Sequence, residues 1–565
     1  MRQWMVAAKK ADFYAIAEKF HVDPVVARII RNREVIGGKN IRIYLGGNLS
    51  DLSDPHQMKD MDRLVEILAQ KIRKQAHIRI IGDYDVDGVT SSHLFLTALR
   101  RVGAKVDVVI PHRIQDGYGL SLHLLQQAKE DGVDTILTCD NGIAAIDEIA
   151  WAKAQKMTVL VTDHHAVPFE EHEGRRTEKK SLADAVVNPH QQDCRYPYKE
   201  LCGAGVAWNV IRVLYENYDM DKREAEDLLD FVAMATVCDV MSLTGENRIL
   251  VKEGLKRIRH TKNIGLQALM QACNVQPENI SAYHFGYVLG PCVNATGRLD
   301  TARHALRLFE TGQETEAEEI ARDLVDLNQE RKELTLQGVE MAKKLCEEGG
   351  YENDPVLVLF LPDVHESIAG LIAGRIREMY NRPVFVLTRG EEGVKGSGRS
   401  TENYSMYENM CGCAELFTKF GGHPMAAGLS LPEENVEKFR RKINENCPLT
   451  VEEVCPDIHI DMAMPVGYAS TELVHQFALL EPFGKDNPSP LFADRNLSIS
   501  RMWVIGKNRN VLRMSVLSEY GQPVPVIFFG DVETLFAYFT EKFGQEEVEN
   551  ALHGRKNRIL FSMVY

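Results

Sequence analysis

Three aspartates at alternate positions, in the run Asp83-Tyr-Asp-Val-Asp-Gly88, follow directly after the apolar segment Ile78–Ile81. They cannot all lie inside a buried strand, because unpaired ionised groups are costly to remove from water. They can gather where a strand ends and the chain turns at Gly88. A divalent cation can neutralise them there, since hard cations prefer carboxylate oxygens. Taken alone, the run is explained equally well by a solvated acidic turn.

A similar arrangement recurs three times. Asp140-Asn-Gly142 follows an apolar stretch from 134, Asp163-His-His165 follows a β-branched stretch from 157, and Asp239 ends an apolar helical segment. A His-His pair alone is more often a surface or core feature than a pair of ligands. The four clusters together supply carboxylates and imidazoles but no thiol pattern, which favours one or two Mn²⁺ or Mg²⁺ ions.

The four clusters resemble the motifs of the DHH phosphoesterase superfamily, in order and in spacing. Gly421-Gly-His423-Pro-Met-Ala-Ala-Gly428 resembles the signature of the associated DHHA1 domain. Nearly end to end, the chain further resembles the RecJ family of single-strand-specific 5′→3′ DNA exonucleases. The motifs that narrow the match are Asp116-Gly-Tyr-Gly-Leu120, Asn294-Ala-Thr-Gly-Arg298, Gly396-Ser-Gly-Arg-Ser400 and Leu480-Glu-Pro-Phe-Gly484.

The resemblance implies metal-dependent phosphodiester hydrolysis, for which two metal ions can activate water and neutralise phosphoryl charge. The ligands that it implies are Asp85, Asp87, Asp140, His164 and Asp239, with Asp83 either a ligand or an orienting group. We expect His165 to contact the scissile phosphate or to carry a proton. We expect Asp163 to hold an imidazole tautomer in place, so that Asp163, His164 and His165 form the catalytic group.

Other residues must select a DNA end, because a metal cluster cannot distinguish a pyrophosphate from a DNA terminus. The resemblance implies that Arg298, Ser397 and Arg399 hold the 5′ end, and a guanidinium suits a terminal phosphate. Each of these arginines alone is more typical of an ordinary surface or ion-pair residue. The remaining residues expected to contact DNA are Arg113, Tyr118 (which would stack on a base), Asn294, His423, Lys507 and Arg509.

Composition agrees with an intracellular enzyme. The 565 residues are 44% hydrophobic, enough for several domain cores. No apolar run approaches membrane-spanning length and the first residues lack the apolar core of a secretory signal, so we expect a cytoplasmic protein. The eleven cysteines are interpreted as reduced thiols. The net charge of −15 disfavours non-specific coating of duplex DNA but permits a local basic groove.

The predicted fold class is α/β, with two α/β domains joined by a long helix around a cleft and a C-terminal β-barrel, by resemblance an OB-fold. Apolar residues recur near helical spacing from Glu314 to Glu348, which favours one rod of about 50 Å. The alternative is two helices broken near Gly338. The expected parts are an N-terminal helical arm (1–70), a DHH catalytic domain (71–245), a helical region with the long helix (246–350), a DHHA1 domain (351–454) and an OB-fold DNA-binding domain (455–565).

The favoured function is a single-strand-specific 5′→3′ exonuclease that releases 5′ mononucleotides in DNA repair and recombination. Its expected partners are single-stranded DNA with a 5′ end, a single-strand-binding protein and a helicase, and a monomer is expected. The main alternative is a DHH phosphodiesterase acting on short oligonucleotides or cyclic dinucleotides, which would need only the two α/β domains. A non-catalytic scaffold should have lost metal ligands, yet every motif position keeps a competent side chain.

Overall fold

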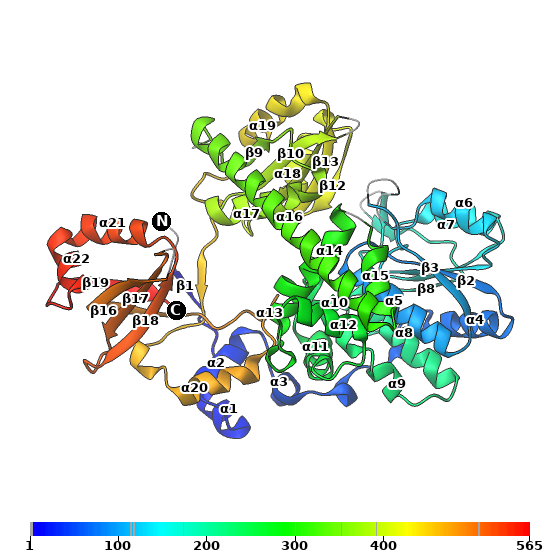
Figure 1. Ribbon diagram of the computed structural model, residues 1–565, viewed down its shortest axis with the longest axis horizontal. Helices are drawn as coiled ribbons and strands as arrows, with labels where there is room; N and C mark the ends of the chain where they lie inside the picture. Colours follow the sequence, from blue (N-terminus) through cyan, green and yellow to red (C-terminus); the bar gives the residue numbers. More distant parts are fainter. Residues whose placement is uncertain are drawn as a thin grey trace. The chain divides into compact units, whose positions relative to one another are not determined.

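The computed structural model divides into two compact units, each described by itself below (Figure 1). The first unit combines residues 1–45, 457–481 and 488–565, and the second combines 46–456 and 482–487. The residues described are 4–113, 116, 119–172, 175–299, 301–351, 353–390, 393–506 and 509–565.

The second unit opens with an α/β domain around a parallel five-stranded sheet of order β3-β2-β4-β5-β8. Its central strands are buried along almost their whole length, as expected for parallel strands covered on both faces. The strands are β2 (His77–Ile81), β3 (Lys105–Val109), β4 (Thr135–Cys139), β5 (Thr158–Thr162) and β8 (Ala185–Val187), and β6 (Phe169–His172) pairs with β7 (Arg175–Glu178) apart from them. The helices of this domain are α4 (Met61–Arg73), α5 (Val86–Arg101), α6 (Leu122–Glu130), α7 (Ile146–Ala154) and α8 (Gly203–Asn217).

The strand order brings the predicted carboxylate cluster to one crevice at the edge of the sheet. The chain leaves β2 toward β3 on one side, whereas β4 lies on the other side of β2. Crevices at such a reversal, outside the carboxyl ends of the strands, are where open α/β sheets bind ligands. The aspartates from 83 to 87 follow β2 and Asp140 follows β4, so the topology brings them to this crevice.

A helical region joins this domain to the next. It comprises α9 (Arg223–Glu226), α10 (Leu229–Cys238), α11 (Gly245–Ile258), α12 (Ile264–Ala272), α13 (Ala282–His284), a π-helical turn (Phe285–Leu289), α14 (Gly290–Leu299), α15 (Arg303–Glu310) and α16 (Glu314–Glu348). The single long helix predicted from 314 to 348 is confirmed. Its first half packs into the core of the first domain through Leu324, and its second half packs into the next core through Val339.

The second α/β domain has a five-stranded mixed sheet of order β12-β13-β11-β10-β9. Its strands are β9 (Leu357–Phe360), β10 (Val384–Gly390), β11 (Gly393–Arg399), β12 (Lys419–His423) and β13 (Ala426–Leu431). Its helices are α17 (Glu366–Tyr380), α18 (Met406–Cys411) and α19 (Val436–Glu445). Both β10 and β11 contact α17, which brings the start of this helix beside the residues of β11.

The first unit joins the two ends of the chain. Strand β1 (Trp4–Val6) pairs with β14 (Ile458–Ile460), and Arg33 forms a nearly buried ion pair of 2.8 Å with Asp461. A curled sheet follows, in which β16 (Phe492–Ile505) pairs with β15 (Met462–Ala463), β17 (Val511–Leu517) and β19 (Leu560–Val564), and β17 pairs with β18 (Pro523–Phe529). Its helices are α1 (Phe13–Phe20), α2 (Pro24–Asn32), α3 (Gly38–Gly46, which ends at the unit boundary), α20 (Thr471–Phe477), α21 (Val532–Phe543) and α22 (Gln545–Leu552). Among the described helices, none is both long enough and apolar enough to cross a lipid bilayer.

A buried aspartate at the start of α10 gives a pH-dependent prediction. Asp230 is 3% exposed and accepts a hydrogen bond of 2.7 Å from the Thr261 hydroxyl. Burial raises the pKa of Asp230 to about 6. Ionisation of Asp230 is therefore more costly in the folded state than in the unfolded state. The free energy of unfolding is highest below about pH 4 and falls by about 3 kcal/mol in all as the pH rises through 6. Asp230→Asn should raise the free energy of unfolding, about twice as much at pH 8 as at pH 5.

Unfolding midpoints of the two proteins at both pH values would measure this gain. Asp227→Asn, which replaces a carboxylate that is 59% exposed, is the matched control and should change little. A gain that is the same at both pH values would contradict the prediction.

Candidate active site

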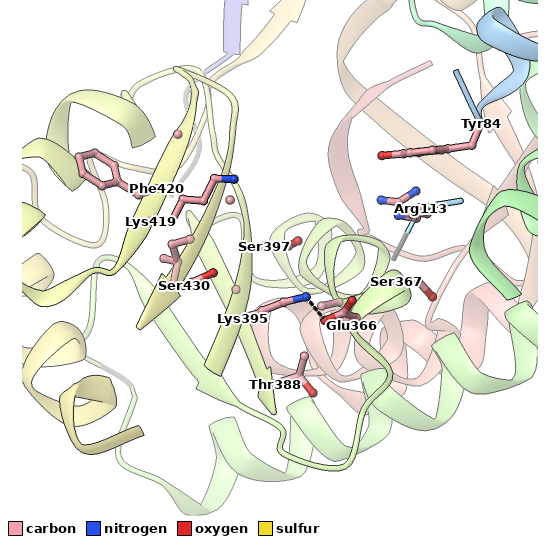
Figure 2. A pocket seen from close by; sticks show the side chains of 15 residues that line it. Tyr84, Arg113, Glu366, Ser367, Thr388, Lys395, Ser397, Lys419, Phe420 and Ser430 are labelled. Atoms are coloured by element: carbon pink, nitrogen blue, oxygen red, sulfur yellow. Dashed lines mark ion pairs between the residues drawn. The ribbon is translucent and has the colours of Figure 1, made fainter. Parts of the chain in front are cut away.

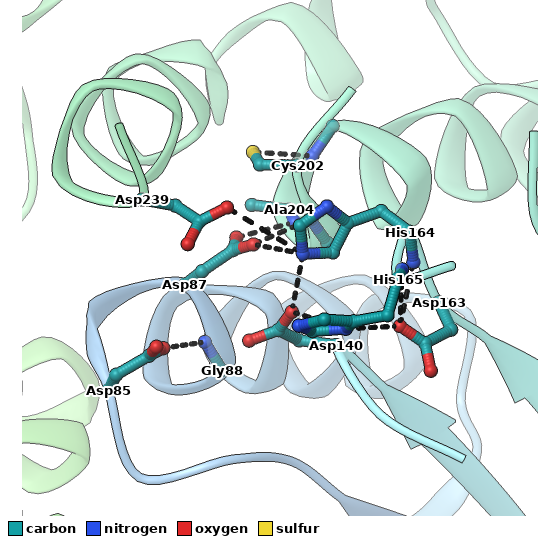
Figure 3. A network of polar contacts seen from close by, with 12 residues as sticks. Asp85, Asp87, Gly88, Asp140, Asp163, His164, His165, Cys202, Ala204 and Asp239 are labelled. Atoms are coloured by element: carbon teal, nitrogen blue, oxygen red, sulfur yellow. Dashed lines mark hydrogen bonds and ion pairs between the residues drawn. The ribbon is translucent and has the colours of Figure 1, made fainter. Parts of the chain in front are cut away.

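A cluster of carboxylates and imidazoles lies at the carboxyl edge of the first sheet (Figure 3). Three carboxylates surround the Nε2 atom of His164. This atom lies 3.0 Å from Asp140 Oδ1, 3.6 Å from Asp239 Oδ2 and 3.7 Å from Asp87 Oδ2. His164 is 7% exposed. Burial lowers the pKa of His164, so the imidazole is neutral at physiological pH and keeps a lone pair that can bind a cation.

The carboxylates of the cluster repel one another. The pKa values of four carboxyl groups are raised, and burial is the largest cause for each: Asp83, Asp85, Asp140 and Asp239. The next largest cause is the charge of Asp85 for Asp83, and the charge of Asp87 for the other three. Such crowding of buried carboxyl groups is relieved when a divalent ion binds between them.

The donor atoms fit a hard divalent ion. Three overlapping groups bring their ligand atoms within 4.8 Å of one another: Asp83 with Asp85 and Asp140, Asp87 with His164 and Asp239, and Asp140 with His164 and His165. Asp83 Oδ1 is buried and makes no hydrogen bond to any part of the chain that the structure describes. Carboxylate oxygens with one or two imidazoles are the ligand set expected for Mn²⁺ or Mg²⁺.

The amino end of helix α8 holds Asp87 in position. The backbone N–H groups of Gly203 and Ala204 donate to the two oxygens of Asp87, at 2.6 and 2.8 Å. These groups are the unpaired donors of a helix start, where a negative charge is stabilised. We did not predict a role for these residues, although the Gly203-Ala-Gly205 run before an apolar helical stretch was an available signal.

Gly203 permits this contact because it lacks a side chain. A Cβ atom at this position would lie 2.6 Å from the Cβ of Asp140, so one of the two residues would have to move. We expect Gly203→Ala to lower metal-dependent activity by at least tenfold, since it displaces a ligand candidate. The matched control is Gly205→Ala in the same turn, where the new Cβ would meet Leu201 at an ordinary 3.4 Å. Equal activity of the two variants would contradict the proposed fit.

Asp163 orients the second histidine of the pair. Its Oδ1 lies 2.7 Å from His165 Nδ1 and also accepts the backbone N–H of His164, while its Oδ2 accepts the N–H of Ile143. Burial alone would lower the pKa of His165, but its hydrogen bond to Asp163 and the nearby carboxylates outweigh burial and raise this pKa to about 9. This raised pKa favours the protonated ring, in which Nδ1 donates to Asp163 and Nε2 carries the second proton.

A cavity of about 440 Å³ lies beside this cluster (Figure 2). Tyr84 and Arg113 from the first domain line it, with the Arg113 guanidinium 4.9 Å from the centre of the Tyr84 ring. The second domain contributes Ser397 and the lysines at 395 and 419. Lys395 forms an ion pair of 2.8 Å with Glu366. The lining therefore combines an aromatic ring, a hydroxyl and cations.

Arg298 and Arg399 lie close to this cavity. One Nη atom of Arg298 donates to the carbonyl of Ser367, a residue of the cavity lining, and one of Arg399 donates to the carbonyl of Gly398. Burial lowers the pKa of both arginines. The charges of Arg113 and Arg399 lower the pKa of Arg298 further. The charges of Arg377 and Arg113 do the same for Arg399. In the part of the chain that the structure describes, neither forms an ion pair with a carboxylate. Such a cationic group favours an anionic ligand.

The structure thus brings most of the predicted site residues of the second unit together. Asn294 accepts the N–H of Val86, so it positions the aspartate loop. His423 is exposed at the end of β12, and Gly421 of the same motif lines the cavity. Arg509 is exposed in the first unit. Tyr118 and Lys507 lie outside the described residues. The functional roles of all these residues stay predictions.

Arg331 was missed from the sequence. It lies on α16, its Nε atom is buried without a hydrogen bond to any described residue, and its charge adds to the effects that lower the pKa of Arg298. An arginine in a long amphipathic helix looks like any solvent-facing residue, so the sequence carried no signal for it. It extends the cationic group by one further charge.

Comparison with known proteins agrees with this geometry. Residues 77–236 match the DHH family, N-terminal domain; residues 353–447 match the DHHA1 domain; and residues 460–557 match the RecJ OB domain. The predicted fold class, with two α/β domains and a C-terminal OB-fold, is thereby confirmed.

Two curated relatives carry the same name. The chain is 34% identical over 518 residues to the single-stranded-DNA-specific exonuclease RecJ of Haemophilus influenzae, covering 88% of each protein. It is 33% identical over 512 residues to the protein of that name in Bacillus subtilis, covering 90% of this chain and 63% of the relative's length.

Solved structures give the same result. The crystal structure of RecJ from Thermus thermophilus in complex with Mn²⁺ superposes with a TM-score of 0.79 at 27% identity, covering 94% of this chain and 74% of that one. The corresponding Mg²⁺ complex gives a TM-score of 0.73, with 94% and 73% covered. From its site, its three matched domains and these relatives, the chain belongs to the RecJ family.

Proposed function

We propose that this protein is a single-stranded-DNA-specific exonuclease that hydrolyses phosphodiester bonds from the 5′ end and releases 5′ mononucleotides with Mn²⁺ or Mg²⁺. The observation that carries the proposal is the carboxylate–imidazole cluster lying next to a cationic cavity in a RecJ-family fold. The cluster supports hydrolysis, and the cavity supports recognition of a strand end. The names of the relatives support the substrate.

The ion or ions would be held by a subset of the cluster. When bound, they supply an activated water at neutral pH and charge neutralisation on the phosphoryl oxygens. The residues that would hold them are Asp83, Asp85, Asp87, Asp140, His164 and Asp239. His164 contributes a neutral Nε2, and helix α8 fixes the carboxylate of Asp87.

His165 would act on the phosphate. Its imidazolium, held by Asp163, presents a positive charge and a proton on Nε2 beside the cluster. The charge stabilises the phosphate as negative charge develops, and the proton can pass to the 3′ oxygen of the released nucleotide as the P–O3′ bond breaks. Asp163 keeps the ring in the required tautomer throughout.

The cationic residues would hold the 5′ terminal phosphate. Arg298 and Arg399 supply guanidinium forks, Ser397 supplies a hydroxyl and Arg113 adds charge from the first domain. Anchoring the terminus beside the cluster would present the first phosphodiester bond for cleavage, which accounts for the 5′→3′ direction. Asn294 positions the aspartate loop, while Tyr118, His423, Lys507 and Arg509 would contact the rest of the strand.

The proposal extends to cellular setting and organisation. The substrate implies a cytoplasmic protein in DNA repair and recombination that acts with a helicase, which supplies single strands, and with single-strand-binding protein. We propose a monomer, and domain boundaries near 70, 245, 350 and 454.

The decisive experiment is digestion of a single-stranded oligonucleotide carrying a 5′ or a 3′ label, with a blunt duplex of the same sequence beside it. We expect early release of the 5′ nucleotide from the single strand, little attack on the duplex, complete loss with a chelator and recovery with added Mn²⁺. Slow attack on long strands with rapid cleavage of two- to five-residue oligonucleotides or cyclic dinucleotides would instead identify the alternative phosphodiesterase class.

A further inference from the structure

Two cysteine sulfur atoms touch where helices α12 and α14 meet. The Sγ atoms of Cys273 and Cys292 lie 3.8 Å apart. Cys273 follows α12 as its cap and is partly exposed, whereas Cys292 is 2% exposed, in the first turn of α14. Cys273 is therefore the more accessible residue of the pair, and Cys292 is the buried one.

The surroundings hold the inner sulfur in place. Asn328 Nδ2 lies 3.4 Å from Cys292 Sγ, and this thiol is 3.3 Å from the carbonyl of Val288 in the preceding turn. A disulfide bond is about 2.05 Å long, so the two sulfur atoms need to approach by somewhat less than 2 Å. We expect rotation of the partly exposed Cys273 side chain to supply this movement.

The outer thiol is also the more acidic of the two. Its contact with Cys292 is the largest cause that lowers the pKa of Cys273, and the ammonium group of Lys332 on α16 adds to it. The same contact and burial raise the pKa of Cys292. The thiolate therefore forms first on the sulfur that solvent reaches, which is the arrangement of an attacking and a resolving cysteine.

Three other cysteines of the second unit differ. Cys139 Sγ lies beside the hydroxyl of Ser92, Cys202 Sγ beside that of Thr236, and Cys238 Sγ beside the carbonyl of Phe285. Burial raises the pKa of all three thiols. Each is a single packing residue, whereas positions 273 and 292 provide two sulfur atoms in contact, one of them on a partly exposed residue.

We propose that Cys273 and Cys292 are a reversible oxidation site, which forms an intramolecular disulfide on exposure to a hydroperoxide such as hydrogen peroxide. The Cys273 thiolate attacks one peroxide oxygen, the O–O bond breaks, and a sulfenic acid and hydroxide form. Cys292 sulfur then attacks the sulfenic sulfur and its thiol proton leaves with the displaced hydroxide as water. In sum, two thiols and one peroxide give one disulfide and two waters, with both sulfur atoms oxidised and the peroxide reduced.

The disulfide would fasten α12 to α14, the helix that supports the aspartate loop. Asn294 of α14 accepts the N–H of Val86, and a Cβ at Gly297 would lie 2.4 Å from the carbonyl oxygen of Tyr84. Helix α14 also carries Arg298. The bond would thus restrain the helix on which the candidate site rests, and its formation does not depend on the proposed nuclease activity.

The test is peptide mapping of the full-length protein after treatment with a few equivalents of hydrogen peroxide in the presence of Mg²⁺, with remaining thiols alkylated before digestion. We expect a linked peptide joining residues 273 and 292, lighter by two hydrogens than its two reduced parts, which dithiothreitol separates. Oxidation should also raise the midpoint of thermal unfolding by about 3–6 °C.

The variants sharpen the test. Cys273→Ser and Cys292→Ser should each abolish the linked peptide and the thermal shift, whereas Cys411→Ser, which removes an exposed cysteine, should keep both. Finding both residues still alkylated after Cys411 has been oxidised would overturn the proposal. Oxidation of Cys273 to the sulfinic acid without any linked peptide would overturn it as well, and both outcomes are read on the wild-type chain.

Discussion

Asp140→Ala is expected to lower the rate of mononucleotide release by about a thousandfold or more, while the protein stays folded. Asp140 is one of the proposed ligands: it groups with Asp83 and Asp85, and its Oδ1 lies 3.0 Å from His164 Nε2, so its loss affects both sides of the cluster. Metal ions contribute several kcal/mol to transition-state stabilisation, and about 4 kcal/mol corresponds to a thousandfold. The pKa of this carboxyl is raised by burial and by the neighbouring carboxylates, so its removal relieves charge repulsion within the cluster.

The measurement is the initial rate on a 5′-labelled single strand in Mn²⁺, with the unfolding midpoint of each protein beside it. Asp230→Asn is the matched control: it also removes a buried carboxylate, and it lies nine residues from Asp239 on the same helix, about 13 Å away. We expect it to keep wild-type activity. An Asp140→Ala protein that is folded and retains a tenth of the activity would refute the assigned ligand set.

The second large effect is expected from Arg399→Ala, which should remove the preference for a 5′-phosphorylated strand. The Arg399 side chain is partly buried near Arg377 and Arg113, and the described residues place no carboxylate within ion-pair distance of it. A terminal phosphate would supply the missing counter-charge. One charge-assisted contact of about 3 kcal/mol corresponds to a loss of roughly a hundredfold in kcat/KM.

Comparing 5′-phosphate and 5′-hydroxyl strands isolates this contact. The variant should lose about a hundredfold on the phosphorylated strand and less than about threefold on the other, because the second strand lacks the group that Arg399 binds. Arg389→Ala is the control, since Arg389 lies on β10 of the same domain and pairs with Glu433 in an exposed ion pair. Equal losses on both strands would assign Arg399 to general DNA binding or to folding.

The parts of the site that follow strands could be predicted from the sequence. Asp83, Asp140 and Asp163 each follow a buried strand, and parallel strands place their carboxyl ends at one edge. Local sequence therefore determined a shared location. The long helix was equally predictable, because its apolar period continues without proline from 314 to 348 and serves two cores in succession.

The remaining parts depend on contacts between distant segments. The hydrogen bonds from the start of α8 to Asp87 join residues more than a hundred positions apart. No sequence pattern around Gly203 predicts which carboxylate accepts them. Arg331 acquires its surroundings only when α16 packs beside α14. Local periodicity reports burial and backbone state, but it does not report which distant charge a side chain will meet.

The pairing of β1 with β14 has a consequence for synthesis of the chain. The first 45 residues find their partners, including Asp461 for Arg33, only after roughly 400 further residues have been made. At about 5–20 residues per second, this delay is roughly 20–80 s. During that interval the α/β domains can fold on the ribosome, whereas the apolar faces of residues 1–45 stay exposed to solvent. Chaperone contact during translation should therefore concentrate on residues 1–45.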